Sequence, residues 1–150
     1  MPYQSVFRPD LFKGQTIVVT GGGSGIGRCT AHELAALGAN VVMLGRTVEK
    51  LAEVRAEIEE DGGQVLTQVC DIRDEAMVIA AIDAVLGTYG RIDGLVNNAG
   101  GQYRAPMKSI STKGFEAVVR SNLNGRVHFH ARGLQPLDGG QRRSDCEYYC

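Results

Sequence analysis

Short apolar runs alternate with longer amphipathic stretches along the first 125 residues of the chain. The short runs are rich in β-branched and aliphatic residues and end at glycine or polar turns, so they predict buried strands at residues 15–20, 39–45, 64–71 and about 92–97. The amphipathic stretches place apolar residues at helical spacing, and they predict helices at residues 24–38, 47–63, 73–90 and 111–125.

The helical periodicity also predicts which side of each helix packs inward, and two polar residues are placed to begin a helix. Thr47 and Ser111 are expected to be N-caps, because a hydroxyl can accept a hydrogen bond from a free N–H of the first turn. The inward positions are expected to be Ile26, Ala31, Leu34 and Ala35; Leu51, Val54 and Ile58; Met77, Ala81, Ala84 and Val85; and Phe115, Val118, Val119 and Asn122.

The alternation of strand and helix predicts an α/β fold with a parallel sheet. Parallel neighbours need crossover connections, and helices in those crossovers cover both faces of the sheet. Because the crossovers are right-handed, a doubly wound sheet is favoured. We expect one domain over residues 1–125, truncated after the fourth strand and helix.

Composition narrows the class of protein. Hydrophobic residues make up 43% and charged residues 22%, as in ordinary globular domains, and the net charge of −1 gives no basis for capture of nucleic acid or an anionic membrane. No apolar stretch is long enough to span a membrane, and the first 15 residues do not form a secretory signal, so we expect a cytoplasmic location. The four cysteines are expected to be reduced, with Cys29 and Cys70 buried.

A glycine-rich turn between the first strand and the first helix is the strongest chemical signal. Residues 20–27 read Thr-Gly-Gly-Gly-Ser-Gly-Ile-Gly. Glycines allow a tight turn and close approach to a ligand, and a helix N-terminus offers backbone N–H groups to phosphate. A tight turn without any ligand is the alternative interpretation, but the strand–turn–helix context favours a dinucleotide site.

Three motifs in order resemble those of the short-chain dehydrogenase/reductase family over about residues 10–125. They are Thr-Gly-x-x-x-Gly-x-Gly at 20–27, Asp71 after the third strand, and Asn-Asn-Ala-Gly at 97–100. The resemblance implies a Rossmann-type fold, an NAD or NADP cofactor and an oxidoreductase. The residues that it implies for cofactor binding are Thr20, Gly21, Ser24, Gly25, Ile26 and Gly27 in the turn, Asp71 and Ile72 at the adenine, and Asn98, Ala99 and Gly100 on the adenosine and nicotinamide side. Without the family, Asp71 could simply be a helix N-cap.

The end of the second strand favours NADP over NAD. A carboxylate there would bind a free ribose 2′-hydroxyl, but residues 44–47 contain no acid and instead contain Arg46, whose guanidinium suits a phosphate. The alternative is a solvated loop arginine. The family often has a second basic contact inside the glycine turn, where this chain has neutral Ser24.

The catalytic machinery that the resemblance implies is only partly present. In the family a tyrosine–lysine pair moves a proton, a serine holds the substrate oxygen, and an asparagine anchors a water. Asn122 matches that asparagine, although it could be an ordinary polar residue near a helix end. The sequence holds no Tyr-x-x-x-Lys, so we expect the chain to be catalytically incomplete. We also expect marginal stability and pairing through an open sheet edge, with a homo-oligomer as one outcome.

Residues 126–150 do not follow the preceding pattern, and two hypotheses remain for them. One is a genuine appendage, with a zinc site at His128, His130, Cys146 and Cys150 or a basic patch of arginines as its candidate sites. We favour the other, an aberrant tail from a shifted reading frame, since moving one nucleotide can turn the last residues into Thr-Val-Asn-Ile-Ile. Sequencing the gene would decide between them. We expect no metal in the domain itself.

The details of the motifs resemble one branch of the family. That branch contains trans-2-enoyl-CoA reductase and citronellol/citronellal dehydrogenases, and it implies a small substrate with an enoyl or isoprenoid chain. Three functions stay open: a catalytically incomplete member of an NADP-dependent oxidoreductase, a dinucleotide-binding chain without catalysis, and an oligomerisation fragment.

Overall fold

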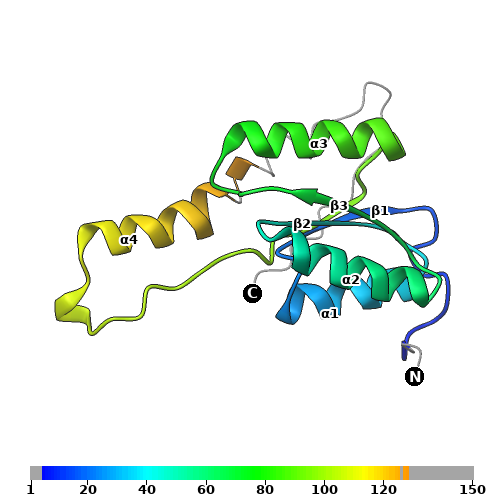
Figure 1. Ribbon diagram of the computed structural model, residues 1–150, viewed down its shortest axis with the longest axis horizontal. Coiled ribbons are helices and arrows are strands. Elements are labelled where there is room, and N and C mark those ends of the chain that lie inside the picture. The colour runs from blue at the N-terminus through cyan, green and yellow to red at the C-terminus, as the bar shows by residue number, and fades with distance from the viewer. Residues whose placement is uncertain (1–4, 126, 129–150) are drawn as a thin grey trace.

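The computed structural model describes residues 5–125 and 127–128, which form a four-stranded sheet with helices on both faces (Figure 1). All neighbouring strands pair in parallel, in the order β3-β2-β1-β4. The strands are β1 (Thr16–Thr20), β2 (Asn40–Gly45), β3 (Gln64–Val69) and β4 (Gly94–Val96). The predicted parallel α/β fold is therefore confirmed.

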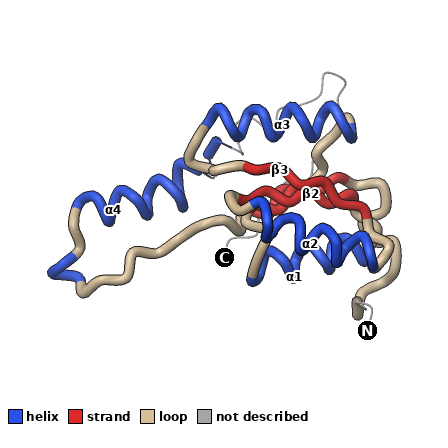
Figure 2. Tube along the Cα trace, viewed as in Figure 1, coloured by secondary structure: helices blue, strands red, loops and turns tan. Residues whose placement is uncertain are grey.

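Two hydrophobic cores lie on opposite faces of the sheet. Helices α1 (Gly25–Ala36) and α2 (Val48–Glu60) cover one face, and α3 (Glu75–Tyr89) covers the other (Figure 2). Successive residues of β1 alternate between them: Ile17 and Val19 pack in the core beneath α1 and α2, and Val18 packs in the core beneath α3. Burial on both faces explains why β1 and β2 are almost entirely apolar.

The inward faces of α1 and α2 match the sequence with one exception. Leu51, Val54 and Ile58 are buried as predicted. The prediction for Ile26 is wrong, because its side chain is 65% exposed. Helix α1 begins at Gly25, and Gly27 takes the inward place one residue later.

The buried face of α3 is centred one residue away from the predicted one. Val78 and Ile82 are buried beside the predicted residues Ala81 and Val85, while Met77 and Ala84 are only partly buried.

Helix α4 (Thr112–Val119) follows a short 3-10 helix, η1 (Met107–Ser109), and continues into a π-helical turn, η2 (Arg120–Asn124). Ser111 is its N-cap, as predicted, and its hydroxyl accepts a hydrogen bond from the Gly114 N–H. The prediction that Phe115 faces inward is wrong, because its side chain is 63% exposed. Figure 1 shows the cause: α4 extends away from the sheet, which does not cover this residue.

The strand order places the carboxyl ends of β1 and β4 side by side. The chain leaves β1 for β2 and β3 on one side, and then returns to add β4 on the other side of β1. This is a topological switch point, where open α/β sheets form a crevice that binds ligands. The glycine turn follows β1 and residues 97–100 follow β4, so the fold brings both motifs to this crevice.

Two further findings concern cysteines and membranes. Cys70 is buried and free, as predicted, whereas Cys29 is free but exposed, so the prediction of burial for it is wrong. No helix in the described part of the chain is both long and apolar enough to cross a membrane.

Apart from residues 127–128, the predicted tail lies outside the described residues, and with it the candidate ligands His130, Cys146 and Cys150.

Candidate functional site

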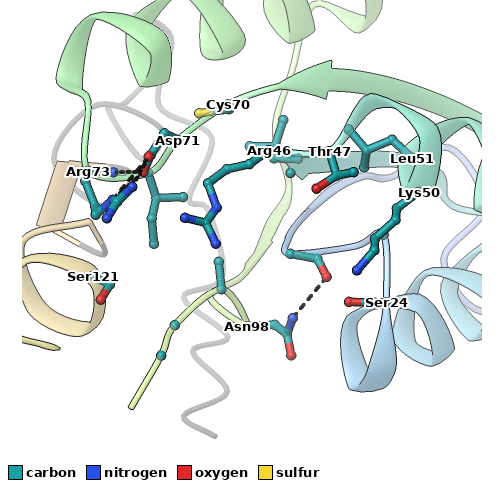
Figure 3. A pocket seen from close by; sticks show the side chains of 18 of the residues that line it. Ser24, Arg46, Thr47, Lys50, Leu51, Cys70, Asp71, Arg73, Asn98 and Ser121 are labelled. Atoms are coloured by element: carbon teal, nitrogen blue, oxygen red, sulfur yellow. Dashed lines mark hydrogen bonds and ion pairs between the residues drawn. The ribbon is translucent and has the colours of Figure 1, made fainter. Parts of the chain in front are cut away.

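A cleft of about 470 Å³ lies at the carboxyl ends of the strands (Figure 3). Its walls come from the glycine turn, the end of β2, the start of α2, the segment after β3, the loop after β4, and α4 with η2. Its volume is within the range of natural small-molecule sites.

The backbone N–H groups that begin α1 have no partner within the helix. The helical hydrogen bonds begin where the Arg28 N–H donates to the Ser24 carbonyl, at 3.2 Å. The N–H groups of Gly25, Ile26 and Gly27 therefore precede the first helical bond, and the Ser24 side chain caps none of them. An uncapped helix start beside a cleft is suited to bind a phosphate.

The glycine turn is held in place by side chains at the ends of β1 and β4. The Asn98 side-chain amide donates to the carbonyl oxygens of Thr20 (3.0 Å) and Gly21 (3.4 Å). The buried Thr20 hydroxyl donates to the Val96 carbonyl and accepts from the Ala99 N–H. These bonds connect the turn to the loop after β4, so both walls of the cleft are fixed relative to each other.

Two glycines of the turn are required by close packing. A Cβ atom on Gly27 would lie 2.3 Å from the Gly21 carbonyl oxygen and 2.5 Å from the Asn98 amide nitrogen. Gly21 itself has a φ of +71°, in the left-handed region that favours glycine. The turn therefore folds back tightly on the start of α1, as a close approach to a phosphate requires.

Asp71 lies in the cleft as a fixed carboxylate. Three N–H groups of Arg73, namely its backbone N, Nε and Nη2, donate to the two carboxylate oxygens. These bonds are the main reason why the pKa of Asp71 is lowered to about 2, and the charge of Arg46 lowers it further. A carboxylate offers about four acceptor positions, and Arg73 makes four hydrogen bonds to them, so a ligand donor such as an adenine amine would share the Asp71 oxygens with Arg73.

Asn122 lies next to the cleft but its side chain is already engaged. Its amide donates to the Gly101 carbonyl (2.7 Å) and to the Val118 carbonyl (2.9 Å), and its oxygen accepts from the Gly101 N–H. A Cβ atom on Gly100 would lie 2.4 Å from that oxygen. In this structure Asn122 therefore fixes the loop after β4 against η2, with its side-chain amide facing the backbone.

The cleft brings together most of the residues predicted for the cofactor, and it adds others. The predicted residues that line it are Gly21, Ser24, Arg46, Asp71, Ile72, Asn98, Ala99 and Gly100. The predicted residues that do not line it are Thr20, Gly25, Ile26, Gly27 and Asn122. Four residues that were not predicted also line it: Lys50, Arg73, Tyr103 and Ser121. The sequence pattern of a helix or a loop does not indicate which of its exposed residues faces a cleft.

Neither metal binding nor a reactive thiol is indicated at this site. Among residues 5–125 and 127–128, no group of His, Cys, Asp and Glu side chains could hold a metal ion. Cys70 lines the cleft, but burial raises the pKa of its thiol to about 11, so it is almost entirely protonated near neutral pH.

Comparison with known proteins agrees with the sequence motifs. The family model described as short chain dehydrogenase matches residues 15–144. The peroxisomal 2,4-dienoyl-CoA reductase of Danio rerio is 35% identical over 124 residues, which cover 82% of this chain and 41% of that protein.

Two solved structures show the same fold. The citronellol catabolism dehydrogenase of Pseudomonas aeruginosa PAO1 is 57% identical with a TM-score of 0.82, over 87% of this chain and 53% of that one. A metagenomic short-chain oxidoreductase in complex with NADP is 38% identical with a TM-score of 0.74, over 80% and 55%. The chain spans about half the length of the relatives that it matches.

Proposed function

The chain belongs to the short chain dehydrogenase family, which consists of NAD(P)-dependent oxidoreductases, and on that premise we propose that its cleft binds NADP(H). In this proposal the cofactor serves hydride transfer to or from an enoyl-CoA, aldehyde or alcohol substrate in the cytoplasm. The observation that carries the proposal is the uncapped start of α1, which opens at the switch-point crevice between β1 and β4.

Each part of a dinucleotide has a fitting partner in the cleft or, for the pyrophosphate, at the start of α1 directly after the lining residue Ser24. The first N–H groups of α1 suit the pyrophosphate, because they have no helical acceptor and carry the positive end of the helix dipole. The Asp71 carboxylate, shared with Arg73, suits the adenine amine, and Arg46 suits a ribose 2′-phosphate. When bound, a nicotinamide dinucleotide would donate or accept hydride.

Arg46 supports NADP in preference to NAD. It lines the cleft, and it makes no hydrogen bond or ion pair with any other described residue, so its guanidinium is available to a ligand. Asp71, the acid among the described residues that line the cleft, is held by Arg73 instead. The complex of the similar metagenomic oxidoreductase with NADP agrees with this choice.

The substrate class rests on similarity. The citronellol catabolism dehydrogenase and the 2,4-dienoyl-CoA reductase are both named for unsaturated carbon chains. The 150 residues contain no Tyr-x-x-x-Lys pair, so we expect them to bind the cofactor without turning over substrate.

A second candidate is a non-catalytic chain that pairs with another copy or with a longer homologue. It is favoured by α4 and η2, where the apolar side chains of Phe115 and Leu123 are 63% and 60% exposed. Sedimentation measurements across a range of protein concentrations would detect such pairing.

The test is a fluorescence titration of the 150-residue chain with NADPH and, separately, with NADH. We expect saturable binding of both with NADPH the tighter, and we expect Arg46→Gln to remove most of that preference. Enoyl-CoA, aldehyde and alcohol panels should then give no turnover. A chain that is folded by circular dichroism but binds neither nucleotide would contradict the proposal.

A further inference from the structure

Lys50 brings a second positive charge to the cleft that Arg46 also lines. It is the third residue of α2, and its side chain lines the cleft. In Figure 3 the Lys50 side chain extends from α2 into the cavity toward Ser24, while Arg46 enters from the end of β2. The two cations therefore reach the same cavity from the two ends of the short β2–α2 connection.

The packing of α2 on the glycine turn fixes where Lys50 begins. A Cβ atom on Gly23 would lie 3.1 Å from the Lys50 Cβ atom and 3.4 Å from its carbonyl carbon. The next residue, Leu51, is buried in the core and anchors this turn of α2. Gly23 on one side and the buried Leu51 on the other fix the backbone of Lys50. The Lys50 side chain therefore begins in contact with the glycine turn.

The charges around Lys50 leave it available to an anion. It makes no hydrogen bond or ion pair with any other residue in the described ranges. The acidic residue one turn further along α2, Glu53, pairs with Arg28. Within the cleft Asp71 forms its ion pair with Arg73, so neither Arg46 nor Lys50 has an ion-pair partner among the described residues that line it.

We propose that Lys50 is a second cationic contact for the ribose 2′-phosphate and thereby a determinant of the preference for NADP over NAD. This inference rests on the proposed function. A phosphate monoester carries about −1.5 to −2 charges at neutral pH, which two cations would balance. Ser24 of the glycine turn is neutral in this chain, and the Lys50 side chain extends toward it, so Lys50 supplies a positive charge on this side of the cleft (Figure 3).

The test compares NADPH and NADH binding to four forms of the full chain: the original sequence, Lys50→Gln, Lys50→Arg and Lys13→Gln. Lys13 is the control lysine, because it precedes β1 at the amino ends of the strands, away from the cleft, and its ion pair with Asp10 is exposed. We expect Lys50→Gln to weaken NADPH binding about fivefold, as for a partly exposed charge pair worth ~1 kcal/mol. NADH binding should stay unchanged, Lys50→Arg should keep the preference, and Lys13→Gln should behave as the original sequence.

The outcomes separate this inference from the proposed function. If the original chain binds NADPH and Lys50→Gln binds it equally well, the inference is overturned while the proposed function stands. If Lys50→Gln weakens NADPH and NADH equally, Lys50 acts at the pyrophosphate and the inference is again overturned. If the original chain binds neither nucleotide, both are overturned. As a second readout, raising the salt concentration should weaken NADPH binding less in Lys50→Gln than in the original chain.

Discussion

Replacing Gly27 by alanine tests the close packing of the glycine turn directly. The backbone φ of Gly27 lies outside the left-handed region, so alanine would meet no conformational strain there. The added methyl carbon would instead lie 2.3 Å from the Gly21 carbonyl oxygen and 2.5 Å from the Asn98 amide nitrogen. To restore ordinary contact distances, the backbone of the turn or of α1 would have to shift by about 1 Å, although packing holds both in place.

The expected cost follows from three contributions. Overpacking of this kind costs about 1–3 kcal/mol, and loss of the Asn98 hydrogen bond adds about 1 kcal/mol. The higher helix propensity of alanine offsets about 1 kcal/mol of this. We therefore expect Gly27→Ala to lower the free energy of unfolding by about 1–3 kcal/mol, and to weaken NADPH binding because the first N–H groups of α1 move away from the turn.

The matched control is Gly87→Ala, which makes the same substitution in α3. A Cβ atom on Gly87 would have no neighbour within 4 Å, and its φ is not left-handed. This variant should gain up to about 1 kcal/mol of stability through helix propensity and should bind NADPH normally. Urea unfolding followed by circular dichroism measures both variants. A Gly27→Ala protein as stable as Gly87→Ala, with unchanged NADPH affinity, would refute the packing argument.

Three other predictions concern titration, thiol reactivity and stability. Arg73→Met should raise the pKa of Asp71 from about 2 toward 3.8, which NMR titration of the Asp71 carboxyl carbon would detect. An unchanged pKa of Asp71 in this variant would contradict the assigned cause. Since the pKa of Asp71 is lowered in the folded state, its pairing with Arg73 stabilises the fold fully above pH ~4 and less as the pH falls through about 2. Iodoacetamide at neutral pH should label the exposed Cys29 before the buried Cys70, as read by peptide mass mapping; equal labelling would count against the described burial. The 150-residue chain should unfold thermally at or below the usual mesophile range of about 45–65 °C, and a cooperative transition well above it would disprove marginal stability.

The strands and the motif positions could be predicted because they depend on local pattern. The apolar run of β1 is buried on both faces, which requires a continuous apolar sequence whatever the rest of the fold does. The glycine turn and residues 97–100 follow β1 and β4 directly, so assigning the strands also places both motifs at one edge of the sheet.

The errors and omissions arose where tertiary packing decides the position of a side chain. Ile26 has the spacing of an inward residue, but the tight packing of Gly27 on Gly21 turns it outward. Phe115 has the same spacing in α4, yet α4 leaves the sheet. Lys50 lies on the exposed side of an amphipathic helix, and only the contact of α2 with Gly23 shows that this side faces the cleft.

The most direct test of the central claim is an amide NMR titration of the ¹⁵N-labelled chain with NADPH. The claim is that the uncapped start of α1 binds the pyrophosphate. We expect the largest shifts at the amides of Gly25, Ile26 and Gly27, with smaller shifts around Asp71. Binding of NADPH that leaves these three amides unshifted, or shifts confined to the far edge of the sheet, would contradict it.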